Sequence, residues 1–421
     1  MGRDDPLCRR YVKVVLAPFG TRGDIQPMVA LGAGLRARGH DVLLTGPANF
    51  GPWVEECELA FAAVGGDFER QLKDAGDAAS GLVYQTRFLV RELVPLQFEI
   101  LPHLCADADL IVGAGVQFAA RSVAEHLGKP YAFVAYAPVA VPSSHYPPPF
   151  VRNQRLPRWV NRLLWRTFGV TSQGLLGRAV TRGRATLGLP PVSDLVAHLS
   201  EVPLILAVEP ELADPPPDLP AATRVTGPLL LRTDASLDGA LERFLDAGAA
   251  PVFVGFGSMV SGSARPVVRL LARAARDIGC RMLVQAGWTG MRASDLDLPD
   301  GCMLIDAAPH DRLFPRVHAA IHHGGAGTTT AVARAGKPQL LLPHLLDQFF
   351  WAHRVRSLGL GPRGVPIHGA RRLAQVSRLL VDLVGTERYA ARARDLASRL
   401  GRIDGVGETV RILERLVAAR V

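Results

Sequence analysis

The sequence predicts an α/β protein with two doubly wound parallel sheets that face each other across a cleft. Short apolar runs alternate with helical periodicity in both halves of the chain, which is the pattern of βαβ units. A proline-rich stretch at 213–220 separates the two series. Because 421 residues exceed what one ordinary core organises, we expect two domains.

The first series begins with an apolar strand and a glycine-rich loop. We expect the strand at 12–17, the loop at 18–24 and a helix that begins near Pro27, since the first turn of a helix tolerates proline. One face of this helix is apolar, with Met28, Leu31 and Leu35 at helical spacing. Further strands are expected at 41–45, 110–113 and 131–135, with a helix at 119–127.

The second series follows the proline-rich break. Its expected strands lie at 252–256, 281–285, 303–305, 319–322 and 339–342, with helices between them. We therefore expect two units joined near residues 213–248, an N-terminal domain at 1–225 and a C-terminal domain at 226–400. A last helix at 401–421 is expected to pack back across the domains.

The composition is that of a soluble globular protein, with 48% hydrophobic and 21% charged residues. The five cysteines are scattered and form no C-x-x-C pair, which disfavours a disulfide framework or structural zinc and fits a reducing cytoplasm. No long apolar run follows the N-terminus, and no run of about 18 apolar residues appears, so neither secretion nor a membrane span is expected.

The formal net charge of +9 raises the question of nucleic acid. The arginines are spread along the predicted helices rather than clustered, and no nucleic-acid motif accompanies them. We therefore expect no nucleic-acid partner. The sequence carries no signal for an oligomeric state.

A glycine-rich loop at 322–330 is the most informative stretch of the chain. It follows the predicted strand at 319–322 and opens a helical segment that we expect at 329–335. Free backbone N–H groups and the positive end of a helix dipole meet at such a turn, which favours phosphate. His323 and the hydroxyls of Thr328 and Thr329 are additional donors there. The loop predicts a phosphorylated ligand, most simply a nucleotide.

Other polar residues follow predicted strands at the same edge of each sheet. Asp24 could act as a general base on an acceptor hydroxyl, or it could merely cap the following helix. Ser258 could donate to the phosphate, or it could be an ordinary turn or N-cap serine. Asp347 and Gln348 supply acceptors and an amide suited to sugar hydroxyls, or they simply begin a helix.

Two apparent motifs carry no function. Residues 32–37 match G-x-G-x-x-A but lie inside a predicted helix, so they are not a dinucleotide fingerprint. The D-x-D pairs at 107–109 and 295–297 have no further ligands nearby in the sequence. We therefore expect no metal site.

Together, the sequence resembles the family-one glycosyltransferases of the GT-B fold. It is closest to the branch of sterol glucosyltransferases and bacterial antibiotic glycosyltransferases, which act on macrolides and glycopeptides. Three segments carry the resemblance, in matching order and spacing: 20–27, 255–259, and 322–330 followed by Asp347 and Gln348.

The resemblance implies an inverting, metal-independent transfer without a cofactor. A hexose would move from a UDP or dTDP sugar, bound by the C-terminal domain, to a hydroxyl of a hydrophobic acceptor bound by the N-terminal domain. Such acceptors include sterols, polyketides and other natural products. Asp24 falls at the general-base position, which many relatives fill with His, while Asp347 could share or replace that role.

The resemblance also assigns donor-binding residues. The matching positions are Thr21, Ser258, Ala308, His310, His323, Gly325, Gly327, Thr328, Asp347 and Gln348. Many plant relatives place a Trp where this chain has Ala307, and Trp288 is a possible substitute for stacking on the base. The alternatives are a nucleotide-sugar epimerase, which would need no hydrophobic acceptor cleft, and a non-catalytic nucleotide-sugar-binding protein.

The segment 152–168 combines arginines with tryptophans at helical spacing. Such a basic amphipathic helix could rest on an anionic membrane as a peripheral contact. The alternative, which we favour, is a mobile lid over the acceptor cleft. The three prolines at 147–149 favour the lid, since they suit a hinged surface loop.

Overall fold

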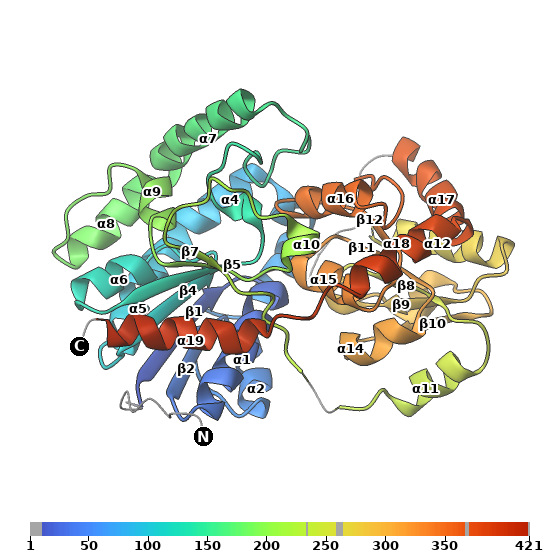
Figure 1. Ribbon diagram of the computed structural model, residues 1–421, viewed down its shortest axis with the longest axis horizontal. Helices are drawn as coiled ribbons and strands as arrows, with labels where there is room; N and C mark the ends of the chain where they lie inside the picture. The colour runs from blue at the N-terminus through green and yellow to red at the C-terminus, as the bar shows by residue number, and fades with distance from the viewer. Residues whose placement is uncertain (1–10, 233–234, 258–263, 367–369, 420–421) are drawn as a thin grey trace, which may run out of the picture.

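The computed structural model describes residues 11–232, 235–257, 264–366 and 370–419. Within them the strands form two parallel sheets in two lobes (Figure 1). The N-terminal sheet has seven strands in the order β3-β2-β1-β4-β5-β6-β7, and the C-terminal sheet has five in the order β10-β9-β8-β11-β12. In each sheet the strand order reverses once, between β1 and β4 and between β8 and β11. The predicted pair of doubly wound units is confirmed.

The N-terminal lobe alternates strands with helices along the chain. Its strands are β1 (Lys13–Phe19), β2 (Asp41–Gly46), β3 (Ala60–Ala63), β4 (Leu110–Gly115), β5 (Tyr131–Ala135), β6 (Leu204–Leu206) and β7 (Thr223–Val225). Its helices are α1 (Arg22–Ala37), α2 (Gly51–Glu56), α3 (Phe68–Ala75), α4 (Leu82–Phe88), α5 (Val94–Leu104), α6 (Ala120–His126), α7 (Arg158–Ser172), α8 (Arg178–Thr186), α9 (Leu195–Ser200) and α10 (Pro210–Ala213). Two π-helical segments, Leu89–Leu93 and Gln173–Gly177, connect α4 to α5 and α7 to α8.

The C-terminal lobe repeats this alternation. Its strands are β8 (Val252–Gly255), β9 (Met282–Gln285), β10 (Cys302–Ile305), β11 (Ala319–His322) and β12 (Gln339–Leu341). Its helices are α11 (Gly239–Asp246), α12 (Ala264–Asp277), α13 (Ala293–Leu296), α14 (His310–Leu313), α15 (Ala326–Arg334), α16 (Gln348–Ser357), α17 (Ala370–Gly385) and α18 (Glu387–Ala397). Short 3-10 helices occur at Ala48–Phe50, Gly76–Ser80, Pro138–Ala140, Gly287–Thr289 and Phe314–Arg316.

Apolar strands buried on both faces organise each lobe. The central strands β1 and β8 are almost wholly buried, as expected for parallel strands covered by helices on both sides. In α1 the apolar face of Met28, Leu31 and Leu35 is buried against the sheet. The cores of the two lobes therefore fix the positions at which their central strands end.

Two helices begin earlier than predicted. α1 begins at Arg22 rather than near Pro27, because Thr21 and Asp24 satisfy each other's backbone groups as reciprocal caps. α15 begins at Ala326 rather than at residue 329, with Gly325 as its N-cap. Pro27 consequently lies inside α1, where its missing N–H removes one helical hydrogen bond.

An apolar and ionic interface joins the lobes. Tyr146 of the N-terminal lobe packs edge-on against Phe350 of α16, with ring centroids 5.0 Å apart. The buried Glu209 accepts a hydrogen bond of 2.5 Å from Arg334 Nε at the end of α15. Arg354 of α16 donates to the Leu212 carbonyl oxygen at 2.9 Å, at the end of α10. These contacts hold the lobes together beside the cleft described below.

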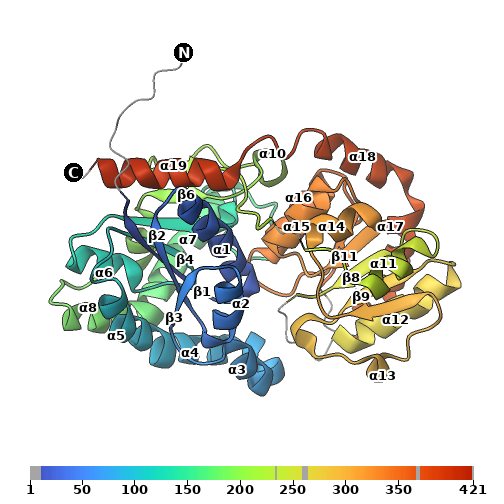
Figure 2. The ribbon, with the colours of Figure 1, turned by 90° about the horizontal axis from the view of Figure 1, so that it is seen from below.

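The last helix, α19 (Gly405–Ala418), returns to the N-terminal lobe and packs on the C-terminal part of α1 (Figure 2). Arg38 donates two hydrogen bonds to Glu414, at 2.7 and 3.0 Å, and Thr409 donates to Thr226 at 3.0 Å. A β-carbon on Gly34 would lie 2.3 Å from Val406 Cγ1, so this glycine permits the close approach of the two helices. The chain thus crosses between the lobes twice.

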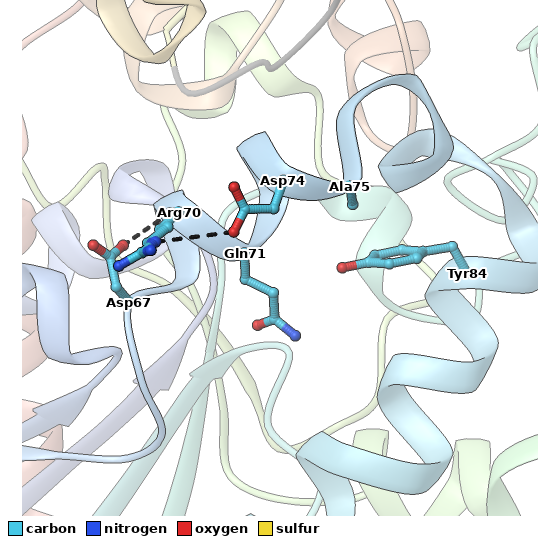
Figure 3. A pocket seen from close by; sticks show the side chains of 6 residues that line it. All are labelled: Asp67, Arg70, Gln71, Asp74, Ala75 and Tyr84. Carbon is cyan, nitrogen blue, oxygen red and sulfur yellow. Dashed lines mark hydrogen bonds and ion pairs between the residues drawn. The ribbon is translucent and has the colours of Figure 1, made fainter.

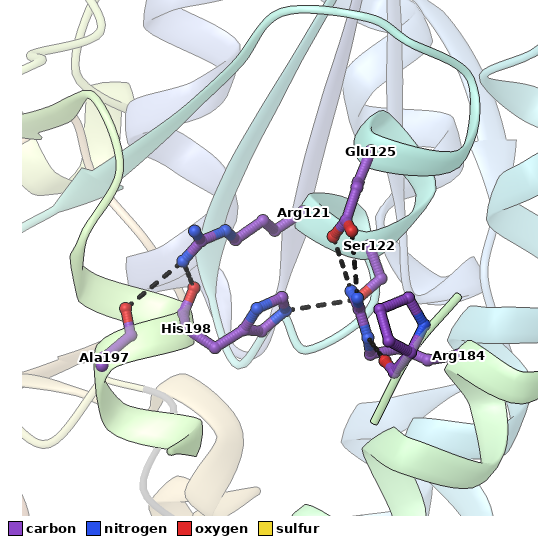
Figure 4. Close-up of polar contacts among 7 residues, drawn as sticks. Arg121, Ser122, Glu125, Arg184, Ala197 and His198 are labelled. Atoms are coloured by element: carbon purple, nitrogen blue, oxygen red, sulfur yellow. Dashed lines mark hydrogen bonds and ion pairs between the residues drawn. The ribbon is translucent and has the colours of Figure 1, made fainter. Parts of the chain in front are cut away.

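A polar network braces the outer helices of the N-terminal lobe (Figure 4). The buried Arg184 of α8 pairs with both oxygens of Glu125, at 2.7 and 3.1 Å, and donates to Ser122 at 3.0 Å. His198 of α9 contacts the same serine hydroxyl at 3.2 Å, and burial lowers the pKa of His198 to about 4. Arg121 donates to the carbonyl oxygen of His198. The network fixes α8 and α9 on α6.

Candidate active site

The carboxyl ends of the central strands of both lobes open into one cleft. Its volume is about 1790 Å³, and residues of both lobes line it. In open α/β sheets, ligands bind where the strand order reverses. Here those points are the ends of β1 and β4 in one lobe and of β8 and β11 in the other. The donor-binding residues and the general base assigned by resemblance all line this cleft, within the described part of the chain.

Two glycines enclose the carboxylate of Asp24. A β-carbon on Gly20 would lie 2.2 Å from Asp24 Oδ2, and one on Gly115 would lie 2.9 Å from Oδ1. Both glycines have positive φ angles, +146° and +64°, which side chains larger than hydrogen rarely adopt. One of these glycines directly follows β1 and the other ends β4, the two strands beside the switch point, so both strands lead to the glycines that admit this acid.

The two oxygens of Asp24 have different surroundings. Oδ2 accepts hydrogen bonds from the Thr21 backbone N–H at 2.8 Å and from its hydroxyl at 3.3 Å. Oδ1 has no hydrogen-bond partner among the residues that the structure describes. Asp24 therefore caps α1 through one oxygen, which is the structural role considered from the sequence, and still lines the cleft.

Burial raises the pKa of Asp24 to about 7, opposed in part by the Thr21 backbone hydrogen bond and reinforced by the negative charge of Asp347. Burial likewise raises the pKa of Asp347 to about 6. The influence of Asp347 means that the two acids, one from each lobe, lie close enough across the cleft to interact. A carboxyl group with a pKa near 7 is suited to accept a proton at neutral pH.

The first turn of α15 presents free backbone donors to the cleft. Gly325 is its N-cap and has no side chain to satisfy the N–H groups that follow, while Gly325, Gly327 and Thr328 all line the cleft. A helix start without a capping side chain favours an anionic ligand. The start of α15 therefore offers the donors that the predicted phosphate site needs, and the site itself stays a prediction.

His323 lies beside this helix start. β-carbons on Gly257 and Gly325 would lie 2.8 Å and 2.6 Å from its Cε1 and Nε2, so the ring fits between two glycines. Burial, with a further contribution from His322, lowers the pKa of His323 to about 3. The ring is therefore neutral at pH 7 in the unliganded protein. It offers a hydrogen bond rather than a positive charge.

One expectation for this loop is wrong. The hydroxyl of Thr329 does not serve the ligand, because it is buried and donates to the Gly325 carbonyl oxygen at 2.9 Å. Helical periodicity explains the difference, since Thr328 and Thr329 lie about 100° apart on α15 and only Thr328 lines the cleft.

A buried pair that the sequence did not predict holds the loop in shape. His322 Nδ1 accepts from the Gly324 N–H at 3.1 Å, so its Nε2 carries the proton and donates to Gln339 Oε1 at 2.9 Å. Gln339 Nε2 in turn donates to the Thr329 carbonyl oxygen at 3.3 Å. The sequence signal that could have indicated this pair is one polar residue in each of two apolar strands, His322 in β11 and Gln339 in β12.

Asp347 and Gln348 both support the loop before α16. Asp347 is the N-cap of α16, and its Oδ2 accepts from Trp351 Nε1 at 3.0 Å. Gln348 Oε1 accepts from the backbone N–H groups of His344 and Leu345 at 2.7 and 3.2 Å. The preceding Leu346 has a φ of +52°, a strained conformation for a branched side chain that often marks functional loops.

The remaining donor-side residues surround the same space. Thr21, Ala308 and His310 line the cleft, and burial lowers the pKa of His310 to about 4. Ser258 lies outside the described residues. Trp288 lines the cleft but its ring packs against Phe50 of the other lobe, with centroids 6.0 Å apart.

The N-terminal side of the cleft is an apolar compartment. Among the described residues, those from Trp53 to Leu204 that line it include no Asp, Glu, Lys, Arg or His. Two of its polar side chains bond to the backbone: Gln117 donates to the Ala17 carbonyl oxygen at 3.1 Å and Tyr136 to that of Asp24 at 3.0 Å. Both π-helical segments contribute lining leucines, and π-helical turns are frequent at functional sites.

A second, polar hollow of about 540 Å³ lies between α3 and α4 (Figure 3). Asp67, Arg70 and Asp74 line it, and Asp67 accepts from the Arg70 N–H at 2.9 Å. Tyr84 lines both this hollow and the cleft. The acids there serve α3 itself, so the hollow offers no further chemistry.

The D-x-D aspartates have structural partners. Asp109 Oδ2 accepts from the Lys13 N–H at 2.9 Å, while Asp295 accepts from the Arg292 N–H at 3.2 Å and pairs with Arg265 at 3.6 Å. Within the described ranges, no three His, Cys, Asp or Glu side chains gather as a metal site. In the same part of the chain, no helix has the length and apolar character needed to span a bilayer.

Comparison with known families matches both lobes. Residues 14–143 match the N-terminal domain of glycosyltransferase family 28. Residues 284–402 match the C-terminal domain of proteins like the erythromycin biosynthesis protein CIII.

Individual relatives extend over most of the chain. It is 36% identical over 359 residues to the vancomycin aglycone glucosyltransferase of Amycolatopsis orientalis, covering 83% of this chain and 85% of that protein. It is 29% identical to the sterol 3-beta-glucosyltransferase of Aspergillus terreus, covering 96% of this chain but 30% of that protein. The solved glycotransferase of kitacinnamycin has the same fold, with a TM-score of 0.73 at 18% identity, covering 97% of this chain and all of that one.

Proposed function

This chain belongs to the family-one GT-B glycosyltransferases, related to glycopeptide antibiotic and sterol glucosyltransferases, and we propose how its cleft performs the transfer. A hexose moves from a nucleoside diphosphate sugar, carrying uridine or thymidine, to a hydroxyl of a hydrophobic acceptor. The configuration at the anomeric carbon inverts, and no metal takes part. The N-terminal lobe binds the acceptor and the C-terminal lobe binds the donor.

The observation that carries the proposal is the position of Asp24. It lies where the apolar compartment meets the donor residues, with a raised pKa and one oxygen free of hydrogen bonds among the described residues. Asp24 accepts the proton of the acceptor hydroxyl as the acceptor oxygen bonds to the anomeric carbon. The bond from that carbon to the diphosphate oxygen breaks at the same time, so a single displacement inverts the centre.

The leaving diphosphate is stabilised by hydrogen bonds. The N–H groups of the first turn of α15 and the His323 ring donate to its oxygens, and the helix dipole adds positive potential. Ser258 and Thr328 add donors, and Thr21 adds one when its hydroxyl turns from Asp24 Oδ2, 3.3 Å away, toward the ligand. Ala308 and His310 lie at the base and ribose, while Asp347 and Gln348 accept from and donate to the hydroxyls of the sugar.

The apolar compartment favours transfer over epimerisation. An epimerase acts on the bound sugar alone and needs no space for an apolar acceptor, yet a large uncharged surface borders Asp24. The two half-buried carboxyl groups also disfavour a protein that only binds the nucleotide sugar. Holding two acids partly away from water costs stability that simple binding does not require.

Mass spectrometry on defined mixtures tests the proposal. The enzyme is incubated with UDP- and dTDP-hexoses, with and without sterol, polyketide and flavonoid acceptors. Transfer predicts an acceptor whose mass has risen by one hexose, together with free nucleoside diphosphate. An epimerised donor without any acceptor product would support the epimerase, and no turnover with retained donor binding would support the binding protein.

A further inference from the structure

Helix α7 has two faces with different surroundings. On its inner face, Asn161 Nδ2 donates to the Ser144 carbonyl oxygen and Trp165 Nε1 to that of Tyr146, both at 2.9 Å. Trp165 also lines the cleft. Pro147 and Pro148, expected in a hinged surface loop, are instead buried, so that expectation is wrong. The helix is thus anchored in a fixed orientation.

The outer face of α7 exposes large apolar side chains. Trp159, Leu163 and Val170 are 66%, 54% and 75% exposed. Their spacing of four and seven residues places them on one side of the helix, opposite Trp165. The hydrogen bonds of Asn161 and Trp165 fix the rotation of the helix, so these apolar side chains stay exposed in the folded protein.

Unpaired arginines border this apolar stripe. Arg155, Arg158, Arg162 and Arg166 are all exposed, and none forms an ion pair with a described residue. The surrounding sequence reinforces the charge, since no acidic residue occurs between Glu125 and Asp194. α7 itself lies at the periphery of the N-terminal lobe (Figure 1). Arg155 precedes this helix and lies near His353 of α16 in the other lobe. We call the surface formed by Arg158, Arg162 and Arg166 with Trp159, Leu163 and Val170 the α7 face.

We propose that the α7 face docks on an anionic lipid bilayer. Arginines beside an exposed Trp and two aliphatic side chains match the boundary between phosphate headgroups and acyl chains. A nucleic acid would engage the arginines but has no counterpart for Leu163 and Val170. A second copy related by a twofold axis would bring the two arginine rows together, which like-charge repulsion opposes.

Docking in this orientation would bring the acceptor compartment beside the bilayer. The outer face of α7 meets the lipid while its inner face, through Trp165, forms a wall of the cleft. An apolar acceptor dissolved in the membrane could then enter without crossing water. This consequence rests on the proposed function, whereas the docking itself does not.

Vesicle co-sedimentation of the full chain, without donor or acceptor, tests the docking. We expect binding to phosphatidylcholine vesicles that contain about one-third phosphatidylglycerol, weakening with added salt, and little binding to phosphatidylcholine alone. The variant R158Q/R162Q/R166Q should lose on the order of 100-fold in partitioning, from the contribution of three arginines near an anionic surface. Its matched control, R388Q/R392Q/R399Q, removes three exposed charges on and after α18 and should bind like the parent.

A second pair of variants isolates the apolar stripe. L163S/V170S should bind the anionic vesicles more weakly, and the control I278S/V381S, which changes exposed aliphatic residues of the other lobe, should not. The fluorescence of the parent should respond to anionic vesicles, and W159F should lose that response. Circular dichroism confirms that each variant is folded.

Several results would overturn the docking. The first is an equal loss of vesicle binding in the α7 and α18 arginine variants, and the second is equal binding of the parent to neutral and anionic vesicles. The third is an affinity for a duplex oligonucleotide equal to that for anionic vesicles, and the fourth is self-association through α7 without lipid. Sugar transfer to a detergent-dispersed acceptor is assayed separately and should be unchanged in the α7 variants. If vesicle binding is absent but sugar transfer is intact, the docking is wrong and the proposed function is unaffected. If transfer is absent but vesicle binding behaves as expected, the proposed function is wrong and the docking is unaffected.

Discussion

Replacement of Asp24 with asparagine should remove the proposed base while keeping the shape of the site. The new amide oxygen can still accept from the Thr21 N–H, as Asp24 Oδ2 now does at 2.8 Å. A positioned general base contributes roughly 10²- to 10⁴-fold, so kcat should fall by that factor. The affinity for the nucleoside diphosphate, measured by calorimetry, should be unchanged, because the amide preserves the loop.

The pH dependence identifies the acid directly. Because the pKa of Asp24 is raised to about 7, kcat/KM for the acceptor should rise about tenfold per pH unit below that value and level off above it. Asp347→Asn removes a negative charge that raises this pKa. The pH range over which kcat/KM rises should therefore move to lower pH, even if the rate itself falls. If kcat/KM of Asp24→Asn still rises with pH in the same range, Asp24 is not the base, and Asp347 is indicated instead.

Stability provides an independent measure of the same shift. The folded pKa of Asp24 exceeds the value of 3.8 for an ordinary carboxyl, so the unfolded chain releases its proton first and wild-type stability falls between about pH 4 and pH 7. The difference between the folded and unfolded pKa values limits this loss in the free energy of unfolding to about 4 kcal/mol, and solvent relaxation makes the loss smaller. The amide in Asp24→Asn is neutral throughout, so the variant should gain stability over the wild type at about pH 8 and not at about pH 4. Urea unfolding at both pH values measures this, and a pH-independent difference would contradict the buried acid.

Three further predictions concern donor, metal and acceptor. His323→Ala should weaken binding of UDP or dTDP about 10- to 100-fold, from one lost hydrogen bond to a charged group. The loss should be equal at about pH 6 and 8, because the ring is already neutral there; unchanged affinity in calorimetry would contradict the donor role. Transfer should persist in excess EDTA, since Asp109 and Asp295 are engaged by the backbone, and a loss restored by magnesium or manganese would show that a metal is required. Trp165→Ala should raise the acceptor KM about tenfold, which corresponds to about 1.4 kcal/mol, and should leave the donor KM unchanged. Trp159→Ala should change neither KM when the acceptor is dissolved. Equal effects of Trp165→Ala on both KM values would argue against Trp165 as a wall of the acceptor compartment.

Local sequence pattern predicted the strands and the edges at which they end. β5 and β11 have the predicted bounds. β5 is an apolar run that begins after Lys129 and Pro130, and β11 is one that ends at His322. Parallel strands end at one edge of a sheet, so residues in the loops after β1 and β11 could be expected in one cleft. α17 was not predicted as such, although the buried Val376, Leu380 and Leu383 recur at helical spacing and would have indicated it.

The rest depends on contacts between distant residues. The hydrogen bond between His322 and Gln339 exists because β11 and β12 are neighbours, which no local pattern specifies. The burial of Pro147 and Pro148 likewise depends on the folded structure, in which the preceding Tyr146 packs against Phe350 of the other lobe. The domain boundary at residue 225 and the roles of the site residues stay predictions, although β7 ends at Val225.

Helix α15 is engaged at both of its ends. Its first turn faces the cleft, while Arg334 at its last turn is tied to the buried Glu209 of the opposite lobe. A change in the angle between the lobes would strain this ion pair and would displace the proposed diphosphate site relative to Asp24. Donor binding that favoured one angle would in turn be favoured by that angle, by the same free energy. Replacing Glu209, which has no place in the proposed chemistry, would then alter the affinity for the nucleotide.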